Sequence, residues 1–231
     1  MSVLALIAAR GGSKGIPRKN LAMVGDRSLL RRAVDSARES GVCDRIVVST
    51  DDEEIAEAAV EAGAESPFRR PAELAGDSTP VLPAIRHAIE CCEADGPAVS
   101  VLVFLQTTVP FRTGAEIAAA VALYREGRHQ SVISVCPLER KPHNIFVKQK
   151  GASLRRLLDH PALMFANRQD MGHLCRLGNG VYVTGRDDVM AGDGLTPEPI
   201  GYVESDRVRS LDIDDDLDLM LARGIAAERG F

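Results

Sequence analysis

The sequence contains no tryptophan, and aromatic residues make up only 4% of its 231 positions. Its core must therefore be built mainly from alanine, valine, leucine and isoleucine. The chain also lacks an apolar stretch of the roughly 20 residues that a membrane-spanning helix needs, which argues against a membrane protein. With 45% hydrophobic and 26% charged residues, the composition is ordinary for a globular protein, and the length suits one large α/β domain over residues 1–231.

Other features are missing as well. The five cysteines are odd in number and include no Cys-x-x-Cys pair, and the apolar N-terminus runs into a charged loop without the basic region of a signal peptide. Both observations favour reduced thiols and a cytoplasmic location. The formal net charge of −5 argues against a general nucleic-acid surface, although a local basic pocket is compatible with it.

The most informative segment begins the chain. Residues 3–9 form an uninterrupted apolar run, typical of a buried parallel strand, and residues 10–20 follow with the sequence RGGSKGIPRKN. Glycines such as Gly12 allow backbone N–H groups to approach a polyanion, and the loop adds four cations: Arg10, Lys14, Arg18 and Lys19. We interpret the loop as a binding site for nucleotide phosphates, at the carboxyl end of the first strand.

Neither of two well-known phosphate-binding motifs is present. The P-loop requires Gly-x-x-x-x-Gly-Lys-Ser/Thr, and the dinucleotide fingerprint requires Gly-x-Gly-x-x-Gly before a helix. The alternative interpretation is a solvated basic turn, because glycine-lysine loops are common on protein surfaces.

After this loop, helical and strand patterns alternate. Helices are expected over residues 29–39, 53–62, 80–93, 114–124 and 215–228, and strands over residues 45–49, 100–105, 131–135, 180–184 and 207–213. This alternation predicts an α/β fold with a doubly wound, mostly parallel sheet. Residues 137–178 break the pattern, and we expect them to form either an irregular surface excursion or an inserted arm or lid that makes a dimer contact.

Two carboxylates close the predicted strand 207–213. Asp212 and Asp214 stand at positions i and i+2, which share one face of a strand, so both are expected to converge on one point. Mg²⁺ typically takes one or two protein carboxylates together with water and substrate phosphates. The alternative is that Asp214 or Asp215 only caps the last helix.

Further polar groups follow other predicted elements. Gln106 begins the stretch QTTVPFR at the end of the strand 100–105, and its amide is suited to reading a base or sugar. Arg112 ends that stretch, where it could stabilise a developing charge or lie exposed beside a proline turn. Arg70 offers a cation in another loop, and Arg168 is a natural bidentate partner for a carboxylate. Tyr182 lies in a predicted strand, where a core position competes with a ligand contact.

Taken together, these segments resemble the acylneuraminate cytidylyltransferase family, the CMP-sialic acid synthetases and their relatives that act on other nonulosonic acids. The matching segments are residues 10–20, STDD at 49–52, RPAELA at 70–75, QTTVPFR at 106–112, RQD at 168–170, NGVY at 179–182 and DID at 212–214. They occur in the family's order. The resemblance implies a Rossmann-like nucleotidyltransferase core, a homodimer with a projecting dimerisation segment, and Mg²⁺-dependent activation of a sugar acid with CTP.

The resemblance also implies roles for single residues. The triphosphate would be held by Arg10, Gly12, Ser13, Lys14 and Lys19, of which Arg10 and Lys14 would stabilise the leaving pyrophosphate. Asn20 would lie near the nucleotide sugar, and Arg70 and Gln106 around the cytidine and the substrate junction. The sugar acid would meet Gln106, Lys141, Arg168 and Tyr182, and Mg²⁺ would be held by Asp212, the metal ligand with a catalytic role, and Asp214.

Two departures from the family pattern limit this assignment. Val81 follows the stretch DSTP at 77–80, where the family often has a small hydroxyl residue, and residues 171–178 lack the expected proline-tyrosine pattern. The second departure leaves the identity of the sugar acid open. The alternatives are a nucleotidyltransferase with another nucleotide and sugar, a glycosyltransferase with an Asp-x-Asp metal site, and a non-catalytic nucleotide-binding protein.

Overall fold

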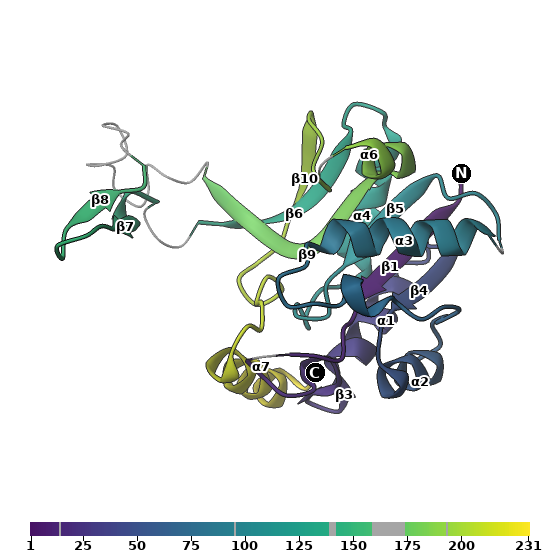
Figure 1. The fold of residues 1–231 in the computed structure, drawn as a ribbon, viewed down its shortest axis with the longest axis horizontal. Helices are drawn as coiled ribbons and strands as arrows, with labels where there is room; N and C mark the ends of the chain where they lie inside the picture. The colour runs from purple at the N-terminus through teal and green to yellow at the C-terminus, as the bar shows by residue number, and fades with distance from the viewer. Residues whose placement is uncertain (14, 95, 139–141, 159–173, 193) are drawn as a thin grey trace.

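A six-stranded sheet forms the centre of the protein (Figure 1), which we describe from a computed structural model over residues 1–13, 15–94, 96–138, 142–158, 174–192 and 194–231. The strand order is β10-β6-β9-β5-β1-β4. The bounds of these strands are β1 Val3–Ala8, β4 Arg45–Ser49, β5 Val101–Leu105, β6 Ser131–Pro137, β9 Cys175–Gly185 and β10 Ile200–Glu204.

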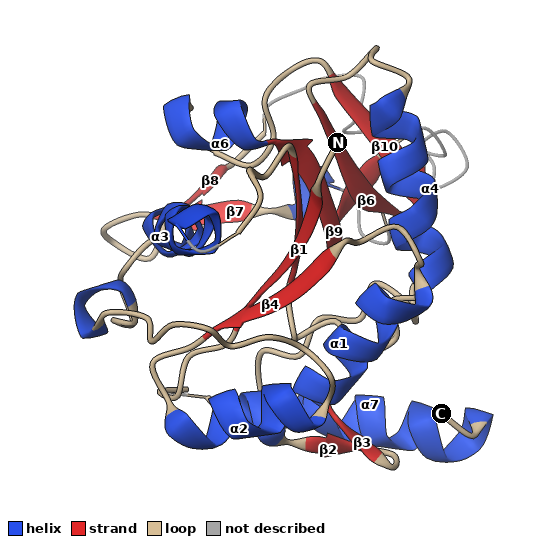
Figure 2. Cartoon of the chain, turned by 90° about the vertical axis from the view of Figure 1, so that its right-hand side faces the viewer, coloured by secondary structure: helices blue, strands red, loops and turns tan. Residues whose placement is uncertain are grey.

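Helices cover both faces of this sheet (Figure 2). One face packs against α1 (Leu29–Glu39), α2 (Glu53–Glu61) and α4 (Gly114–Arg125), and the other against α3 (Val81–Ala94) and α6 (Arg186–Ala191). The last helix, α7 (Asp216–Arg229), lies away from the sheet beside the short hairpin β2 (Met23–Val24) and β3 (Arg27–Ser28). Within the described residues, no helix is long and apolar enough to span a bilayer.

Strand pairing confirms the mostly parallel sheet. β1 pairs in parallel with β4 and β5, and β6 with β10, whereas β9 runs antiparallel to both β5 and β6. The reason is where β9 begins: Cys175, its first residue, pairs with Pro137, the last residue of β6, so the two strands run in opposite directions.

Two sequence expectations need correction. Residues 207–213 do not form a strand: the Asp206 carboxylate accepts the backbone N–H groups of Val208 (2.8 Å) and Arg209 (2.9 Å), which stabilises a turn. Such local side-chain bonds compete with a sheet ladder. The strand beside β6 is instead β10, which the apolar pattern does not indicate, because Ile200 and Tyr202 on this edge strand are exposed.

The connections place a ligand site at one edge of the sheet. β1, β4 and β5 are mutually parallel, so their carboxyl ends meet at the same edge. The chain leaves β1 towards β4 on one side, and later adds β5 on the other side of β1. Crevices at such a switch in strand order are the usual ligand sites of open α/β sheets.

A projecting hairpin occupies part of residues 137–178 (Figure 1). It consists of β7 (Phe146–Lys148) paired antiparallel with β8 (Leu154–Arg156), preceded by a 3₁₀ turn at Pro142–Asn144. Both strands are exposed along most of their length, including the apolar side chains of Phe146 and Leu154, and Ile145 directly before β7 is exposed as well. We call β7 and β8 together the arm hairpin.

Candidate active site

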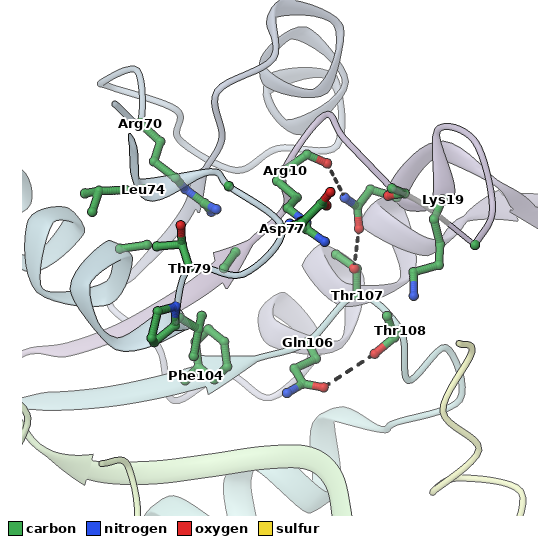
Figure 3. Close-up of a pocket in the computed structure, with 18 residues that line it drawn as sticks. Arg10, Lys19, Arg70, Leu74, Asp77, Thr79, Phe104, Gln106, Thr107 and Thr108 are labelled. Carbon is green, nitrogen blue, oxygen red and sulfur yellow. Dashed lines mark hydrogen bonds and ion pairs between the residues drawn. The ribbon is translucent and has the colours of Figure 1, made fainter. Parts of the chain in front are cut away.

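A cavity of about 410 Å³ opens at the carboxyl ends of β1 and β5 (Figure 3). This is within the range of small-molecule sites. Its polar and charged lining residues are Arg10, Ser13, Lys19, Asn20, Arg70, Asp77, Thr79, Gln106, Thr107 and Thr108. Six of these, Arg10, Ser13, Lys19, Asn20, Arg70 and Gln106, are residues that the sequence assigns to nucleotide binding.

Asn20 connects the loop of residues 10–20 to the end of β5. Its side chain is buried, donates to the backbone carbonyl of Arg10 (2.8 Å) and accepts from the Thr107 hydroxyl (2.5 Å). A buried amide that uses both its donor and its acceptor fixes the separation of the two segments. Asn20 therefore holds the loop of residues 10–20 against the end of β5, at the wall of the cavity.

The start of the same loop is anchored to the end of β4. The Asp51 carboxylate accepts the backbone N–H of Gly11 (3.0 Å), and Asp52 pairs with Arg18 (2.5 Å) while capping α2. The Arg18 hydrogen bond lowers the pKa of the Asp52 carboxyl. A Cβ at Gly11 would lie 2.7 Å from the Asp52 carboxylate, so only glycine allows this close approach.

Three cations line the described part of the cavity. Arg10 pairs with the Asp77 carboxylate (3.0 Å), and Lys19 donates to the backbone carbonyl of Ile213 (2.8 Å). Arg70 is buried, donates to the Ser49 hydroxyl (3.1 Å) and carbonyl, and has its pKa lowered by that burial. Cations converging on one cavity favour a polyanionic ligand.

The acidic segment 212–214 lies against the loop of residues 10–20. Ile213 is fully buried in a cluster with Ile16, and its N–H donates to the Thr108 carbonyl (2.9 Å). Lys19 lies 3.8 Å from the Asp214 carboxylate, which is itself 81% exposed. The two segments, almost 200 residues apart in the chain, thus meet through contacts that include the Ile16–Ile213 cluster and Lys19.

Among the described residues, Asp212 has a hydrogen-bond partner at one of its two carboxylate oxygens. Its Oδ2 accepts from the Asn179 amide of β9 (2.7 Å), and its buried Oδ1 accepts from none of the described residues. A buried carboxylate oxygen without a donor is costly, and a cation would satisfy it. Within the described residues no three His, Cys, Asp or Glu side chains are grouped to hold a metal. Mg²⁺ commonly takes only one or two protein carboxylates and completes its coordination with water and substrate phosphates.

Asp214 and Asp215 differ in role. Asp215 is the N-cap of α7 and forms a capping box with Asp218, so the helix-capping alternative is correct for Asp215. The Asp214 side chain does not cap α7; it reaches towards Lys19. Because residues 211–214 are not a strand, the argument that alternation brings Asp212 and Asp214 together does not hold.

Arg112 does not point into the cavity, which corrects the idea that it stabilises a developing charge. It is 6% exposed and donates to the carbonyls of Gln106 (3.0 Å) and Gly180 (2.8 Å) and to the Ser36 hydroxyl (3.2 Å). Burial lowers the pKa of its guanidinium to about 10. Its role in the fold is to join the end of β5 to the middle of β9.

Substituting Arg112→Leu should therefore destabilise the protein. The two carbonyls would lose a buried donor, and the free energy of unfolding is expected to fall by about 2–4 kcal/mol. Urea denaturation followed by circular dichroism measures this change, with Arg128→Leu, in the exposed bend after α4, as a control. An unchanged midpoint for Arg112→Leu would contradict the joining role.

The remaining predicted site residues fall into two groups. Gly12 is an exposed loop residue with open space around it, and Tyr182 is a buried residue of β9 whose hydroxyl donates to Asn179 (2.9 Å). Three predicted residues lie outside the described residues: Lys14, Lys141 and Arg168.

Sequence reasoning missed two site residues. Asp77 was not expected to pair with Arg10, because no sequence spacing relates the two loops. Asn179 belongs to a segment that matches the family, but the sequence analysis assigns it no role. The run Gly-Asn-Gly within a strand pattern is a signal for a bulge or a close backbone approach.

Comparisons with known proteins show the family and the fold. Residues 4–171 match the family model described as "Cytidylyltransferase". The flagellin modification protein B of Campylobacter coli is 28% identical over 98% of this chain and 96% of its own length. The CMP-N,N'-diacetyllegionaminic acid synthase of Legionella pneumophila is 28% identical over 96% and 94%. A solved CMP:2-keto-3-deoxy-manno-octonic acid synthetase with CTP shares the fold, with a TM-score of 0.73 at 13% identity over 99% of this chain and 100% of its own.

Proposed function

The chain belongs to the cytidylyltransferase family, and from this premise we propose that it activates a nonulosonic acid with CTP, releasing pyrophosphate and a CMP-sugar. We propose this class of sugar because one relative is named as a CMP-N,N'-diacetyllegionaminic acid synthase. The observation that carries the proposal is the meeting of the cationic loop and the acidic segment, through Lys19, beside a cavity that suits a nucleotide.

The reaction we propose is a direct displacement. The anomeric hydroxyl of a 2-keto-3-deoxy sugar acid attacks the α-phosphorus of CTP, and the bond to the β-phosphate oxygen breaks. No covalent enzyme intermediate is needed, so the protein positions the reactants and offsets charge.

In this proposal the loop of residues 10–20 holds the triphosphate. Arg10, Ser13 and Lys19 line the cavity and offer charged or hydroxyl donors, and Lys14 and Gly12 belong to the same loop. A phosphate oxygen that binds Arg10 competes with the Asp77 carboxylate for its guanidinium. Arg10 and Lys14 then stabilise the charge that develops on the leaving pyrophosphate.

In this proposal the same cavity also receives the cytidine and the sugar acid. Asn20, Arg70 and Gln106 line the cavity, and we assign them contacts with the nucleoside. Arg168 and Lys141 supply the cations that a sugar carboxylate requires. This last assignment rests on the family resemblance of those two positions.

We propose Mg²⁺ as the cofactor, held by Asp212 and Asp214. The support is the unpartnered buried oxygen of Asp212 and the preference of Mg²⁺ for few protein carboxylates. When bound, Mg²⁺ would polarise the α-phosphate and lower the pKa of the attacking hydroxyl. Lys19, whose ammonium lies 3.8 Å from the Asp214 carboxylate, would help to orient that carboxylate.

A pyrophosphate-release assay tests the proposed function. Four nucleoside triphosphates are paired with a panel of nonulosonic acids, and with sugar phosphates as alternative acceptors. Pyrophosphate formation only with CTP and a nonulosonic acid is expected. Turnover with another nucleotide pair would favour a different nucleotidyltransferase, and CTP binding without turnover would favour a non-catalytic protein.

We also propose that the protein is a homodimer joined through the arm of residues 137–178, and that it works in the cytoplasm, where CTP is made. Support comes from exposed apolar side chains on the arm hairpin and directly before it: Ile145 (50% exposed), Phe146 (42%) and Leu154 (61%). Exposed apolar clusters of this kind are typical of interaction surfaces.

The substitution Leu154→Asp tests this dimer. A charge in place of a leucine buried between two copies should weaken association by about 10- to 100-fold, because burying a leucine contributes roughly 1.5–3 kcal/mol. Sedimentation equilibrium over a concentration series measures the dissociation constant, and Ser153→Asp adds the same charge one residue away. A dimer of unchanged strength in Leu154→Asp would rule out this interface.

A further inference from the structure

Asn179 adopts a backbone conformation that is unusual for a residue with a side chain. Its φ is +56°, in the left-handed region, and it stands between Gly178 and Gly180 in β9. The register of β9 against β6 shifts at the same place, between the partners of Ile133 and Val135. Asparagine tolerates this region better than most residues, but the conformation still needs support from its surroundings.

That support comes from two buried side chains. The Ser134 hydroxyl accepts the N–H groups of both Gly180 (3.1 Å) and Val181 (3.0 Å), and Arg112 donates to the Gly180 carbonyl (2.8 Å). A Cβ at Gly178 would lie 3.0 Å from the Ser134 hydroxyl, and one at Gly180 3.3 Å from it. The segment is therefore closely fitted, and the direction of the Asn179 side chain is fixed by the backbone.

Asp212 and Tyr182 together fix the orientation of the Asn179 amide. The Asp212 carboxylate can only accept, so the amide nitrogen faces its Oδ2 (2.7 Å), and the Tyr182 hydroxyl donates to the amide oxygen (2.9 Å). Burial and the charge of Asp212 raise the pKa of Tyr182 to about 12, so the hydroxyl remains a donor at neutral pH. The amide cannot reverse without losing one hydrogen bond and facing oxygen to oxygen.

We infer that Asn179, oriented by Tyr182, is a positioning residue that holds Asp212 by Oδ2 and leaves Oδ1 for the divalent cation. The inference rests on the proposed function, since it concerns the metal of that reaction. In this inference Tyr182 supports the residue that holds Asp212, and does not contact the sugar acid. Partners behind a metal ligand usually matter for metal affinity, because they fix the orientation of the ligand.

The test compares three variants of the full chain. Asn179→Gly removes the amide but is compatible with positive φ, so the backbone of β9 is kept. Tyr182→Phe removes only the hydroxyl that orients the amide. Tyr124→Phe removes a hydroxyl from a half-buried tyrosine on α4, outside the cavity, and serves as the control. Thermal unfolding of each variant verifies that it is folded.

The readout is CTP binding by isothermal titration calorimetry over a range of Mg²⁺ concentrations, without sugar acid, so that no turnover occurs. Asn179→Gly and Tyr182→Phe are expected to raise the half-saturating Mg²⁺ concentration by about 10-fold or more. CTP binding in EDTA should stay within about twofold of the wild type, because only the carboxylate has been released. Tyr124→Phe should match the wild type in both measurements.

Two results would overturn the inference, and only the second would also overturn the assignment of a metal to Asp212. If wild-type binding depends on Mg²⁺ and both variants retain that dependence unchanged, Asn179 and Tyr182 do not position Asp212. The metal assignment would then stand. If wild-type CTP binding does not depend on Mg²⁺ at all, the metal assignment fails together with the inference.

Discussion

Replacing Asp212 by alanine is expected to lower kcat by about 10²- to 10³-fold while the protein remains folded. Asp212 carries the buried oxygen without a partner, and in the proposed reaction that oxygen helps to hold the cation at the α-phosphate. Pyrophosphate release with saturating CTP and sugar acid measures the loss. Asp212→Asn keeps the shape of the side chain and separates the effect of charge from that of packing.

The fold should survive because, among the residues that the structure describes, the Asp212 side chain is held by a single hydrogen bond, from Asn179. Losing that bond costs about 1–3 kcal/mol, which a thermal melt detects. Asp216→Ala is the matched control, since Asp216 is an exposed acid in the first turn of α7. CTP-dependent turnover at the wild-type rate in Asp212→Ala would refute the metal assignment.

Replacing Lys19 by methionine is expected to lower kcat/KM for CTP by about 10²-fold. Methionine is similar in length, so the change removes mainly the charge and the hydrogen bond to the Ile213 carbonyl (2.8 Å). Lys19 both lines the cavity and joins the loop to the acidic segment, so its loss weakens triphosphate binding and loosens the contact with Asp214.

Initial rates over a CTP series separate the two effects, since weaker ground-state binding raises KM and a misplaced segment lowers kcat. Lys19→Arg restores the charge and should recover part of the activity. Arg128→Met removes one exposed cation far from the cavity and should change neither constant. Equal activities of Lys19→Met and Arg128→Met would exclude Lys19 from the site.

Most helices and strands could be predicted because their signals are local. The pattern of residues 29–39 places apolar side chains on one face, and α1 has those bounds in the structure. The acidic residues that follow Asp52 also predicted the start of α2, where Asp52 is the N-cap. These signals depend on neighbouring residues alone, so tertiary packing did not override them.

The predictions of strands failed where another interaction competed with the local strand pattern or where the pattern did not distinguish two outcomes. Residues 208–211 have an apolar pattern that fits a strand, but Asp206 captures two backbone N–H groups and holds a turn. The direction of β9 could not be predicted either, because period-two alternation is identical in parallel and antiparallel strands. β10 was not predicted, because the apolar residues Ile200 and Tyr202 of this edge strand are exposed. Its sequence therefore lacks the pattern of a strand with one buried apolar face.

By itself, the sequence determined the α/β alternation, the cationic glycine loop after β1 and the family to which the chain belongs, because these are properties of residue order. Only the tertiary structure decided which groups meet: Lys19 with Ile213, Arg10 with Asp77, and Asn179 with Asp212. Each pair joins segments that are more than 30 residues apart. Such contacts depend on the burial of side chains such as Ile16 and Ile213 in one cluster, and no spacing along the chain encodes them.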